Sequence, residues 1–326
     1  MRRKRKSHKK YSKYVVFVGA NPAGIMSKWN TWKKIIRETK ASVWFLQETK
    51  NKMAKLKLEN FVIYERVRPL EITDNGLGPG GGGVAIAAIK ELNPVLTREG
   101  DGETETITID IHPKNMVISC TSAYGPQKKH SKENKIAFWT YLDEEVDKAD
   151  MTGKGVIIQG DLNARLGYKE LPDDPNPQND NGRHFSDFLK RHPQLTVVNS
   201  LSLCKGLITR RRVLCTGKVE EAALDFFVVC SRVLPYVSEM EIFDGSRHML
   251  TNYTQVKRGE EATNSDHFAE LMKAKFEVCP TKPNKTEILN FKNKEEQIKF
   301  TELTTKTTVF TDCMMMNEPI LSKCDK

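Results

Sequence analysis

The chain alternates between short apolar runs and amphipathic or polar stretches, a rhythm typical of proteins that combine strands with helices. Predicted strands lie at residues 14–18, 41–49, 61–66, 83–89, 105–111, 116–123, 156–160 and 223–229, and a last strand ends near residue 276. In the run at 105–111, Ile107, Ile109 and Ile111 alternate with polar residues. This alternation predicts a strand with one face exposed.

Apolar residues at helical spacing predict the intervening helices. Ser27 precedes a set of large apolar residues on one helical face, so we expect it to cap a helix there. These apolar residues are Trp29, Trp32, Ile35 and Ile36. Further predicted helices lie at 133–149, around 185–189 and at 291–303. The order of strand, helix and strand favours an α/β arrangement.

A glycine-rich segment at 75–82 separates two of the predicted strands. Gly76, Gly78 and Gly81 match the G-x-G-x-x-G pattern of dinucleotide-binding turns, but a β-rich run follows them instead of a helix. No Lys–Ser/Thr pair completes a phosphate-binding loop either. We therefore expect a mobile loop here.

The run at 156–160 ends in the sequence Gly-Asp-Leu-Asn-Ala-Arg at 160–165. Residues two apart on an extended backbone point the same way, so Asp161 and Asn163 would project together from the strand end. A carboxylate there can accept a proton from water while the amide holds that water or a phosphate oxygen. The alternative is an Asx-type turn that simply closes a buried strand.

The formal charge of +10 and the pI near 9.1 favour a polyanionic partner. Much of the excess charge lies at the N-terminus, in Arg2, Arg3, Lys4, Arg5, Lys6, Lys9 and Lys10. We expect residues 1–13 to form a basic disordered arm that contacts phosphates or serves as a nuclear import signal. The alternative is a flexible tail without a partner.

The cysteines indicate a reducing compartment. There are seven of them, an odd number, and none forms a C-x-x-C pair. This pattern indicates reduced thiols in the cytosol or nucleus and argues against a disulfide scaffold or a zinc site. No apolar run approaches the ~20 residues that span a bilayer, so we expect no membrane partner.

Five predicted strand ends carry polar side chains, and a sixth strand begins with an acid. These residues are Asn21, Glu48, Tyr124, Asp161 with Asn163, Asp266 with His267, and Asp225. Each has an ordinary structural explanation, as a turn residue, a solvated acid or a buried aromatic. Their order and spacing along the chain are more informative than any one of them.

The motifs around these residues resemble, in this order, those of the endonuclease/exonuclease/phosphatase superfamily. They are Asn-Pro-Ala-Gly at 21–24, Gln-Glu-Thr at 47–49, Tyr-Gly-Pro at 124–126, Gly-Asp-Leu-Asn at 160–163, Leu-Asp-Phe at 224–226 and Ser-Asp-His at 265–267. The resemblance covers residues 14–276. Within the superfamily, the motifs look most like those of the apurinic-type endonuclease domain of non-LTR (LINE-like) retrotransposons. It implies an α/β (α+β) fold: a four-layer αββα sandwich of two mixed β-sheets flanked by helices, DNase I-like.

The resemblance also implies hydrolysis of a phosphodiester that depends on Mg²⁺, with Mn²⁺ as the alternative ion. Glu48, helped by Asn21, would hold the metal, because hard oxygen ligands suit magnesium. Asp266 would ligate the metal directly or through water. Asp161 would position or deprotonate the attacking water, and Asn163 would orient that water.

Two further residues complete the implied site. His267, its ring held by Asp225, would stabilise charge on the phosphate or serve as the base in place of Asp161. Tyr124 would donate a hydrogen bond to the scissile phosphate. One position departs from the pattern: repair-type relatives often carry an acid where this chain has Ala23, and retrotransposon members vary there.

Arg210, Arg211 and Arg212 fall where relatives contact DNA, as does the loop at 171–182. Arginine binds phosphate well, so these residues would supply salt-sensitive affinity with little sequence choice. The alternative is a solvated basic loop.

We therefore expect a DNA endonuclease that nicks target DNA for retrotransposon insertion by target-primed reverse transcription. The alternatives are an abasic-site repair endonuclease, a phosphatase of inositol phosphates or sphingolipids, and a catalytically inactive nucleic-acid-binding module of the same fold. The basic arm and the Tyr-Gly-Pro motif argue against the phosphatase. The expected partner is DNA, with element RNA and a reverse transcriptase domain as further candidates, and the expected location is the nucleus.

The expected domain organisation has three parts. The basic arm at 1–13 precedes an endonuclease/exonuclease/phosphatase domain at 14–278. A polar, partly helical tail at 279–326 would link toward a reverse transcriptase domain that this chain does not contain.

Overall fold

The computed structural model describes residues 14–25, 35–50, 58–68, 71–73, 76–78, 82–101, 104–168, 170–171, 174, 176–243 and 265–278. The predicted basic arm, the predicted cap at Ser27 and the tail at 279–326 lie outside these residues. Within the described part, no helix is both long and apolar enough to cross a membrane. The four cysteines described there, Cys120, Cys204, Cys215 and Cys230, are all free thiols.

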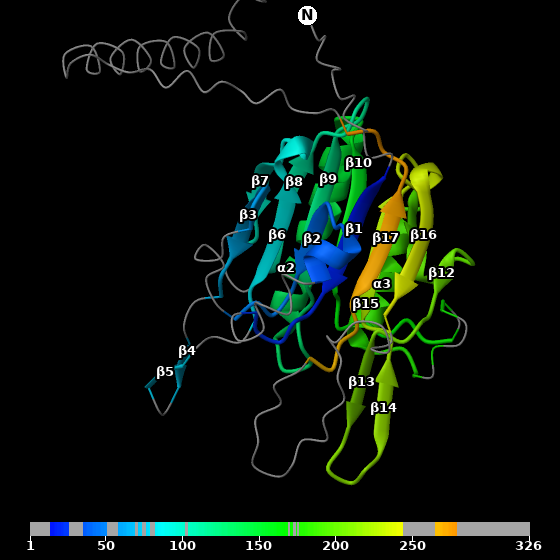
Figure 1. Cartoon of the computed structure of the whole chain (residues 1–326). Helices are drawn as coiled ribbons and strands as arrows, with labels where there is room; N and C mark the ends of the chain where they lie inside the picture. The colour runs from blue at the N-terminus through cyan, green and yellow to red at the C-terminus, as the bar shows by residue number, and fades with distance from the viewer. Residues whose placement is uncertain are drawn as a thin grey trace, which may run out of the picture. The chain divides into compact units, whose positions relative to one another are not determined.

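Two large mixed sheets make up most of the fold (Figure 1). The seven-stranded sheet has the order β12-β16-β17-β1-β2-β6-β3. Its strands span, in that order, Cys204–Lys205, Val237–Ile242, Glu270–Ala274, Val15–Ala20, Val43–Leu46, Val84–Ile89 and Phe61–Arg66. The six-stranded sheet has the order β11-β15-β10-β9-β8-β7. Its strands span Leu195–Val197, Asp225–Cys230, Gly155–Asp161, Ile118–Tyr124, Glu105–Ile111 and Val95–Glu99.

The two sheets pack face to face around a shared apolar core. Phe17, Phe45 and Ile86 of the seven-stranded sheet belong to the same buried cluster as Ile109 and Phe227 of the six-stranded sheet. The rings of Phe45 and Phe227 meet edge to face, with centroids 5.9 Å apart. Burial of one face of each sheet against the other is the main apolar contribution to the sandwich.

Helices cover the outer face of the six-stranded sheet. α2 spans Lys132–Met151 and α3 spans Asp180–Arg191, and each begins with a side-chain cap, from Ser131 and Asn179 respectively. Trp139 of α2 stacks on Phe185 of α3, whose ring lies 5.3 Å from that of Phe226 in β15. Short 3₁₀ turns span Lys90–Leu92, Val198–Ser200 and Leu234–Tyr236.

A second apolar cluster covers the outer face of the seven-stranded sheet. Val16, Val18 and Trp44 pack there with Ile35, which opens the helical residues 35–39. Both faces of the central strands are therefore buried, which explains why their sequences read as continuous apolar runs. The structure has the predicted α/β sandwich architecture, with helices outside two mixed sheets.

The predicted half-exposure of the strand at 105–111 is wrong, because all seven residues of β8 are buried. Its isoleucines face the core, while helix α2 covers its polar face. Thr108 bonds the hydroxyls of Thr121 and Tyr141, at 2.9 and 3.1 Å. Hydrogen bonding to a covering helix lets a polar strand face be buried at little cost.

Two small hairpins also differ from prediction (Figure 1). Part of the glycine-rich segment is a strand, β5 (Gly76–Gly78), paired with β4 (Glu71–Thr73), where a loop was expected. The three arginines lie within a strand, where the alternative interpretation had placed a basic loop, since β13 spans Arg210–Val213 and pairs with β14 (Val219–Ala222). The β13–β14 hairpin extends beyond the end of the sheets.

Candidate active site

The candidate site lies at one edge of the sandwich, where strands from both sheets end. In the seven-stranded sheet β1 and β2 run parallel, and Asn21 and Glu48 follow their ends. In the six-stranded sheet, Asp161 is the last residue of β10. It lies opposite Tyr124 of the parallel strand β9 and opposite Asp225 of the antiparallel strand β15. Directly opposed residues have neighbouring side chains, so three polar groups are brought together by register alone.

Residues 265–267 reach this edge from the far end of the domain. β17 runs antiparallel to β1, so the segment before β17 lies beside the end of β1. The hydroxyl of Ser265 donates to the carbonyl of Asn21 and accepts the backbone N–H of His267. These bonds fix the Ser-Asp-His motif beside the Asn-Pro-Ala-Gly motif, although 244 residues separate Asn21 from Ser265.

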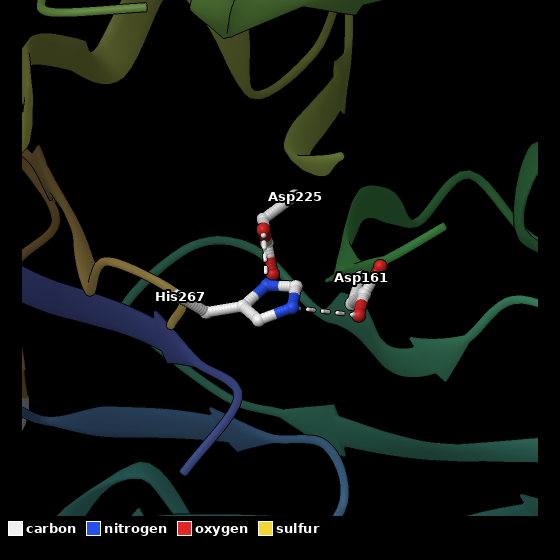
Figure 2. A group of neighbouring side chains, drawn as sticks. All are labelled: Asp161, Asp225 and His267. Atoms are coloured by element: carbon white, nitrogen blue, oxygen red, sulfur yellow. Dashed lines mark hydrogen bonds and ion pairs between the residues drawn. The ribbon is translucent and has the colours of Figure 1, made fainter. Parts of the chain in front are cut away.

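The imidazole of His267 lies between two carboxylates (Figure 2). Its Nδ1 atom is 2.9 Å from an oxygen of Asp225, and its Nε2 atom is 3.6 Å from an oxygen of Asp161. All three side chains are buried, with exposed fractions of 7%, 1% and 2% for His267, Asp225 and Asp161. A buried cation between two buried anions is the stable arrangement of such groups, because each charge compensates the other.

This arrangement changes the acidity of the groups involved. Burial alone would lower the pKa of His267, but the charges of Asp225 and Asp161 outweigh it and raise that pKa to about 10. Burial is the main cause that raises the pKa of Asp161, to about 7, despite the opposing attraction of His267. The imidazole is therefore protonated at neutral pH, and Asp161 is the group whose pKa lies near neutral pH.

Glu48 joins this group through Asn21. The amide nitrogen of Asn21 donates to Glu48 at 3.1 Å and to Asp161 at 3.0 Å, so one side chain connects the two carboxylates. The hydroxyl of Tyr124 donates to the same oxygen of Glu48 at 2.8 Å. Burial would raise the pKa of Glu48, but the bonds from Asn21 and Tyr124 and the charge of Lys50 hold it below its ordinary value. Glu48 is therefore ionised.

The backbone is strained at three of these motif positions. Glu48, Ala23 and Asn163 have φ angles of 44°, 48° and 48°, in the left-handed region that disfavours most side chains. Hydrogen bonds hold each in place, such as the bond from the backbone N–H of Asn163 to Asp161 at 3.0 Å. Clusters of strained residues of this kind are typical of functional sites.

Asp266 lies near the same ring nitrogen of His267 as Asp161 does. One of its oxygens accepts the Nε–H of Arg210 at 2.8 Å, and the other lies 3.9 Å from Nε2 of His267. Burial would raise the pKa of Asp266, but the charges of His267 and Arg210 hold it below its ordinary value. Asp266 is thus a partly exposed, ionised carboxylate beside the site.

The three arginines of β13 have different environments. Arg210 is linked to the site by its hydrogen bond to Asp266. Arg211 donates to Glu221, which lies directly opposite it in β14, and its guanidinium lies 5.5 Å from the ring of Phe268. Arg212 is exposed. The structure therefore does not present them as one open cationic cluster.

The donors at this edge fit a hard divalent cation. Glu48 uses one oxygen to accept from Asn21 and Tyr124, while its other oxygen faces the ammonium of Lys50 at 3.4 Å. Asp161, Asp225 and His267 also bring one ligand atom each within 4.8 Å of one another. A metal between them would have to displace the protonated imidazole, whereas Glu48 and Asp266 are ionised carboxylates outside this group.

Three positioning residues were not predicted. The hydroxyl of Thr209 accepts the backbone N–H groups of Leu224 and Asp225, at 2.9 and 3.0 Å, and so fixes the start of β15. The amide of Gln127 donates to the hydroxyl of Tyr124 at 2.8 Å. Ser265 was noted only as part of a motif. Nothing in the sequence distinguishes Thr209 from other threonines, although the place of Gln127 directly after Tyr-Gly-Pro could have drawn attention.

Comparison with known proteins gives one family and one fold. The sequence profile described as "Endonuclease/Exonuclease/phosphatase family" matches residues 29–267. No curated protein sequence matches the chain significantly.

Similar solved structures include the endonuclease domain of TRAS1, a telomere-specific non-LTR retrotransposon, with 14% identity, a TM-score of 0.54 and coverage of 80% of this chain and 98% of that chain. The AP endonuclease LMAP from Leishmania major is 17% identical, with a TM-score of 0.60 and coverage of 81% and 88%. The catalytic domain of APE2 from Xenopus laevis is 15% identical, with a TM-score of 0.57 and coverage of 82% and 94%. At these identities the similarity shows a shared, DNase I-like fold.

Proposed function

We propose, since the chain belongs to the endonuclease/exonuclease/phosphatase family, that it is a Mg²⁺-dependent DNA endonuclease that nicks target DNA for retrotransposon insertion by target-primed reverse transcription. Membership makes the chain a hydrolase of the nuclease and phosphatase class. The proposal narrows that class to one substrate, one metal and one biological step.

One observation carries the proposal: the buried Asp225–His267–Asp161 group is joined through Asn21 to the ionised carboxylate of Glu48. It combines a proton acceptor, a positive charge and a cation ligand in one connected group of side chains. Hydrolysis of a phosphodiester needs these three functions.

The choice of DNA and of the retrotransposon branch has separate support. The solved structures with the same fold include DNA-acting enzymes by their names, among them the TRAS1 domain, nearly all of which is covered. The motif Gly-Asp-Leu-Asn-Ala-Arg at 160–165 and Ala23 in place of an acid favour the same branch.

In the proposed mechanism Glu48 and Asp266 would hold the metal, which when bound would supply positive charge to the scissile phosphate. Asn21 orients Glu48 and also contacts Asp161. The side-chain oxygen of Asn21 accepts the backbone N–H of Ala23 at 3.0 Å, and its side-chain nitrogen faces the carboxylates. We therefore assign Asn21 a positioning role.

Asp161 is the better candidate for the base that accepts the proton of the attacking water. His267 already carries its proton at neutral pH, because Asp225 and Asp161 raise its pKa. A protonated imidazole cannot accept another proton, but it can donate a hydrogen bond to a phosphate oxygen and stabilise the negative charge that develops there. Asp225 holds the ring through Nδ1, which leaves Nε2 directed toward Asp161 and the substrate side.

Tyr124 and Asn163 have supporting roles in this mechanism. The Tyr124 hydroxyl already donates to Glu48, so it holds the metal ligand, and a bond to the phosphate would replace that contact. The amide nitrogen of Asn163 donates to the carbonyl of Gly125 at 2.8 Å. This bond fixes the side chain, so that its own oxygen can orient the water beside Asp161.

The test is relaxation of supercoiled plasmid in Mg²⁺ by the parent, by Asp161→Ala and by His267→Ala. We expect the parent to nick and each variant to lose at least about 10²-fold in rate. A parent that binds DNA but leaves the plasmid supercoiled would show an inactive binding module instead. Comparison of an intact duplex with one that contains an abasic site then separates a target-nicking enzyme from a repair enzyme.

The nuclear location and the partnership with element RNA and a reverse transcriptase domain are also proposals. The basic run within residues 1–13 supports the location. Replacement of its lysines and arginines by serine in a fluorescent fusion should move the protein out of the nucleus. An unchanged distribution would contradict this role of the arm.

A further inference from the structure

A row of buried polar side chains lies between the two sheets, one layer inside the active site. Gln159 precedes Asp161 by two residues on β10, so both side chains lie on the same face of the strand. Gln47 directly precedes Glu48, and Glu270 opens β17, three residues after His267. Gln47, Gln159 and Glu270 are each fully buried, with an exposed fraction of 0%.

Glu270 is the centre of this row. One of its oxygens accepts the amide N–H of Gln159 at 3.1 Å, and the other accepts that of Asn199 at 2.8 Å. Gln159 belongs to β10 and Asn199 to the 3₁₀ turn after β11, both on the side of the six-stranded sheet, whereas Glu270 belongs to the seven-stranded sheet. The carboxyl group therefore bonds across the interface between the sheets at two points.

Each bond of Glu270 leads on to a residue of the site. Asn199 donates to the backbone carbonyl of Asp225 at 3.2 Å and accepts the N–H of Phe227 at 2.9 Å, which ties it to the start of β15. Gln159 accepts the amide N–H of Gln47 at 2.9 Å, and Gln47 also donates to Ser122 of β9 at 3.0 Å.

The fold makes specific room for this row. Gly19 lies opposite Glu270 in the pairing of β1 with β17. A Cβ atom at Gly19 would lie 2.0 Å from the amide nitrogen of Gln159, so any other residue at this position would displace the network. An apolar sandwich core would need neither the glycine nor the acid.

A buried carboxyl group is costly unless its bonds are specific. Burial and the charges of Asp225 and Asp161 raise the pKa of Glu270 to about 8, while the bonds from Gln159 and Asn199 oppose this rise. Hydrogen bonds within a buried polar network favour one arrangement of the core, because a shift would leave further polar groups unpaired. The network thus disfavours sliding of one sheet over the other.

Such sliding would disturb the site directly, because its residues come from both sheets. The seven-stranded sheet and its extensions supply Asn21, Glu48, Asp266 and His267. The six-stranded sheet supplies Tyr124, Asp161, Asn163 and Asp225. The contacts of His267 with Asp225 and Asp161, at 2.9 and 3.6 Å, cross the interface, and displacements of about 1 Å at such contacts cost ~10²-fold in rate.

We propose that Glu270 is a positioning residue that, through Gln159 and Asn199, holds the two halves of the active site in register across the sheet interface. The activity part of its test rests on the proposed function. A second measurement, on the imidazole of His267, does not depend on any activity.

The experiment compares the parent with Glu270→Met, which keeps the side-chain size but removes both acceptors, and with Met272→Ala as a matched control. Met272 is buried in the same strand, belongs to the apolar core and has no part in the hydrogen bonds described above, so this control lowers stability without removing a bond of the network. Rates are compared at temperatures where circular dichroism shows each variant to be folded. We expect Glu270→Met to lower kcat for plasmid nicking by about 10–100-fold with KM within about threefold of the parent, and Met272→Ala to leave both near the parent values.

The second measurement is the NMR signal of the imidazole N–H of His267 in the absence of metal. Hydrogen bonding to Asp225 should place it far downfield in the parent and in Met272→Ala, and Glu270→Met should shift or broaden it. The proposal is overturned if Glu270→Met keeps the parent signal and kcat, or if Met272→Ala loses as much of both. A parent with the signal but no nicking would refute the proposed function and leave the positioning role to be decided by the signal.

A rescue pair keeps the test decisive even if Glu270→Met does not fold. In Glu270→Gln alone, the new amide N–H group faces the amide N–H group of either Gln159 or Asn199. Two donors then face each other, and one hydrogen bond is lost. The exchange Q159E/E270Q restores one acceptor and one donor across the interface and keeps the acceptor for Gln47. We expect the exchanged pair to recover at least about tenfold in kcat over Glu270→Gln, and equal rates in the two would contradict the positioning role.

Discussion

Asp161 and Asp225 occupy directly opposed positions in the antiparallel pairing of β10 with β15, and both carboxylates face the same imidazole. Two buried acids on adjacent strands would repel each other if nothing stood between them. The charge of His267 compensates both, which makes the three side chains one electrostatic unit. Several predictions about acidity and rate depend on this unit.

The first prediction concerns pH. The pKa of His267 is raised from 6.5 to about 10 in the folded protein, so its pairing stabilises the fold fully below the unfolded pKa of 6.5 and is lost as the pH rises through 10. Between these limits the free energy of unfolding should fall by up to about 5 kcal/mol in the metal-free parent. Asp225→Asn should lower the pKa of His267 and flatten this dependence. Chemical denaturation at several pH values, together with NMR titration of the imidazole, measures both, and a parent imidazole that titrates near 6.5 would refute the pairing.

The second prediction concerns the amide that joins Glu48 to Asp161. Asn21→Ala removes both hydrogen bonds, so each carboxylate loses one of its donors and the link between them is broken, and we expect kcat to fall by about 10–100-fold with little change in KM. Ser42→Ala is a matched control, because Ser42 also accepts a hydrogen bond within the same sheet, from Val16 at 3.3 Å. Steady-state nicking rates of both variants decide the matter. An Asn21→Ala enzyme as fast as the control would show that the bridge has no catalytic role.

The third prediction concerns the metal. Glu48→Gln keeps the size of the side chain but removes its charge, so the dissociation constant for Mg²⁺ should rise by about 10–100-fold. Ala23→Asp should lower it, since aspartate tolerates the positive φ of 48° at this position and returns a carboxylate to the vicinity of Glu48. Isothermal titration with Mg²⁺ measures both variants. Unchanged affinity in Glu48→Gln would place the metal elsewhere.

The fourth prediction separates two neighbouring arginines. Arg212 is exposed, so Arg212→Met should weaken binding to all DNA sequences alike and reduce the slope of log K against log salt by about 1. Arg210 bonds Asp266, so Arg210→Met should lower kcat and change the salt slope less. Fluorescence anisotropy with labelled duplexes at several salt concentrations gives the slopes. Equal slopes in the two variants would mean that the arginines have no separate roles.

The sequence predicted the central strands well for a physical reason. Strands such as β1 and β10 are buried on both faces, so their apolar runs are continuous, and the polar residue that ends each run is conspicuous. Asn21 and Asp161 could be recognised in this way, and the structure brings their side chains within 3.0 Å. Their proximity depends on the docking of two sheets, which no local pattern encodes.

The features that sequence analysis missed arise from that docking. Glu270 begins the stretch Glu-Leu-Met-Lys-Ala, in which an acid looks like an ordinary exposed strand residue, yet its exposed fraction is 0%. The polar face of β8 looked exposed for the same reason. Helix α2, which covers this face, lies in a later part of the chain. The arginines of β13 looked like an open cluster because their partners, Glu221 and Asp266, lie on other segments. Pairing across segments cannot be read from periodicity.

The strand that completes the seven-stranded sheet beside β1 comes from the end of the domain, and it is preceded by residues 265–267. A nascent chain therefore emerges with Asn21, Glu48 and Asp161 already made but without the imidazole that faces them. The proposed activity would therefore be withheld until nearly the whole domain has been translated and folded. By the same logic, a chain cut short before residue 265 would lack Asp266 and His267 and could not carry out the proposed reaction.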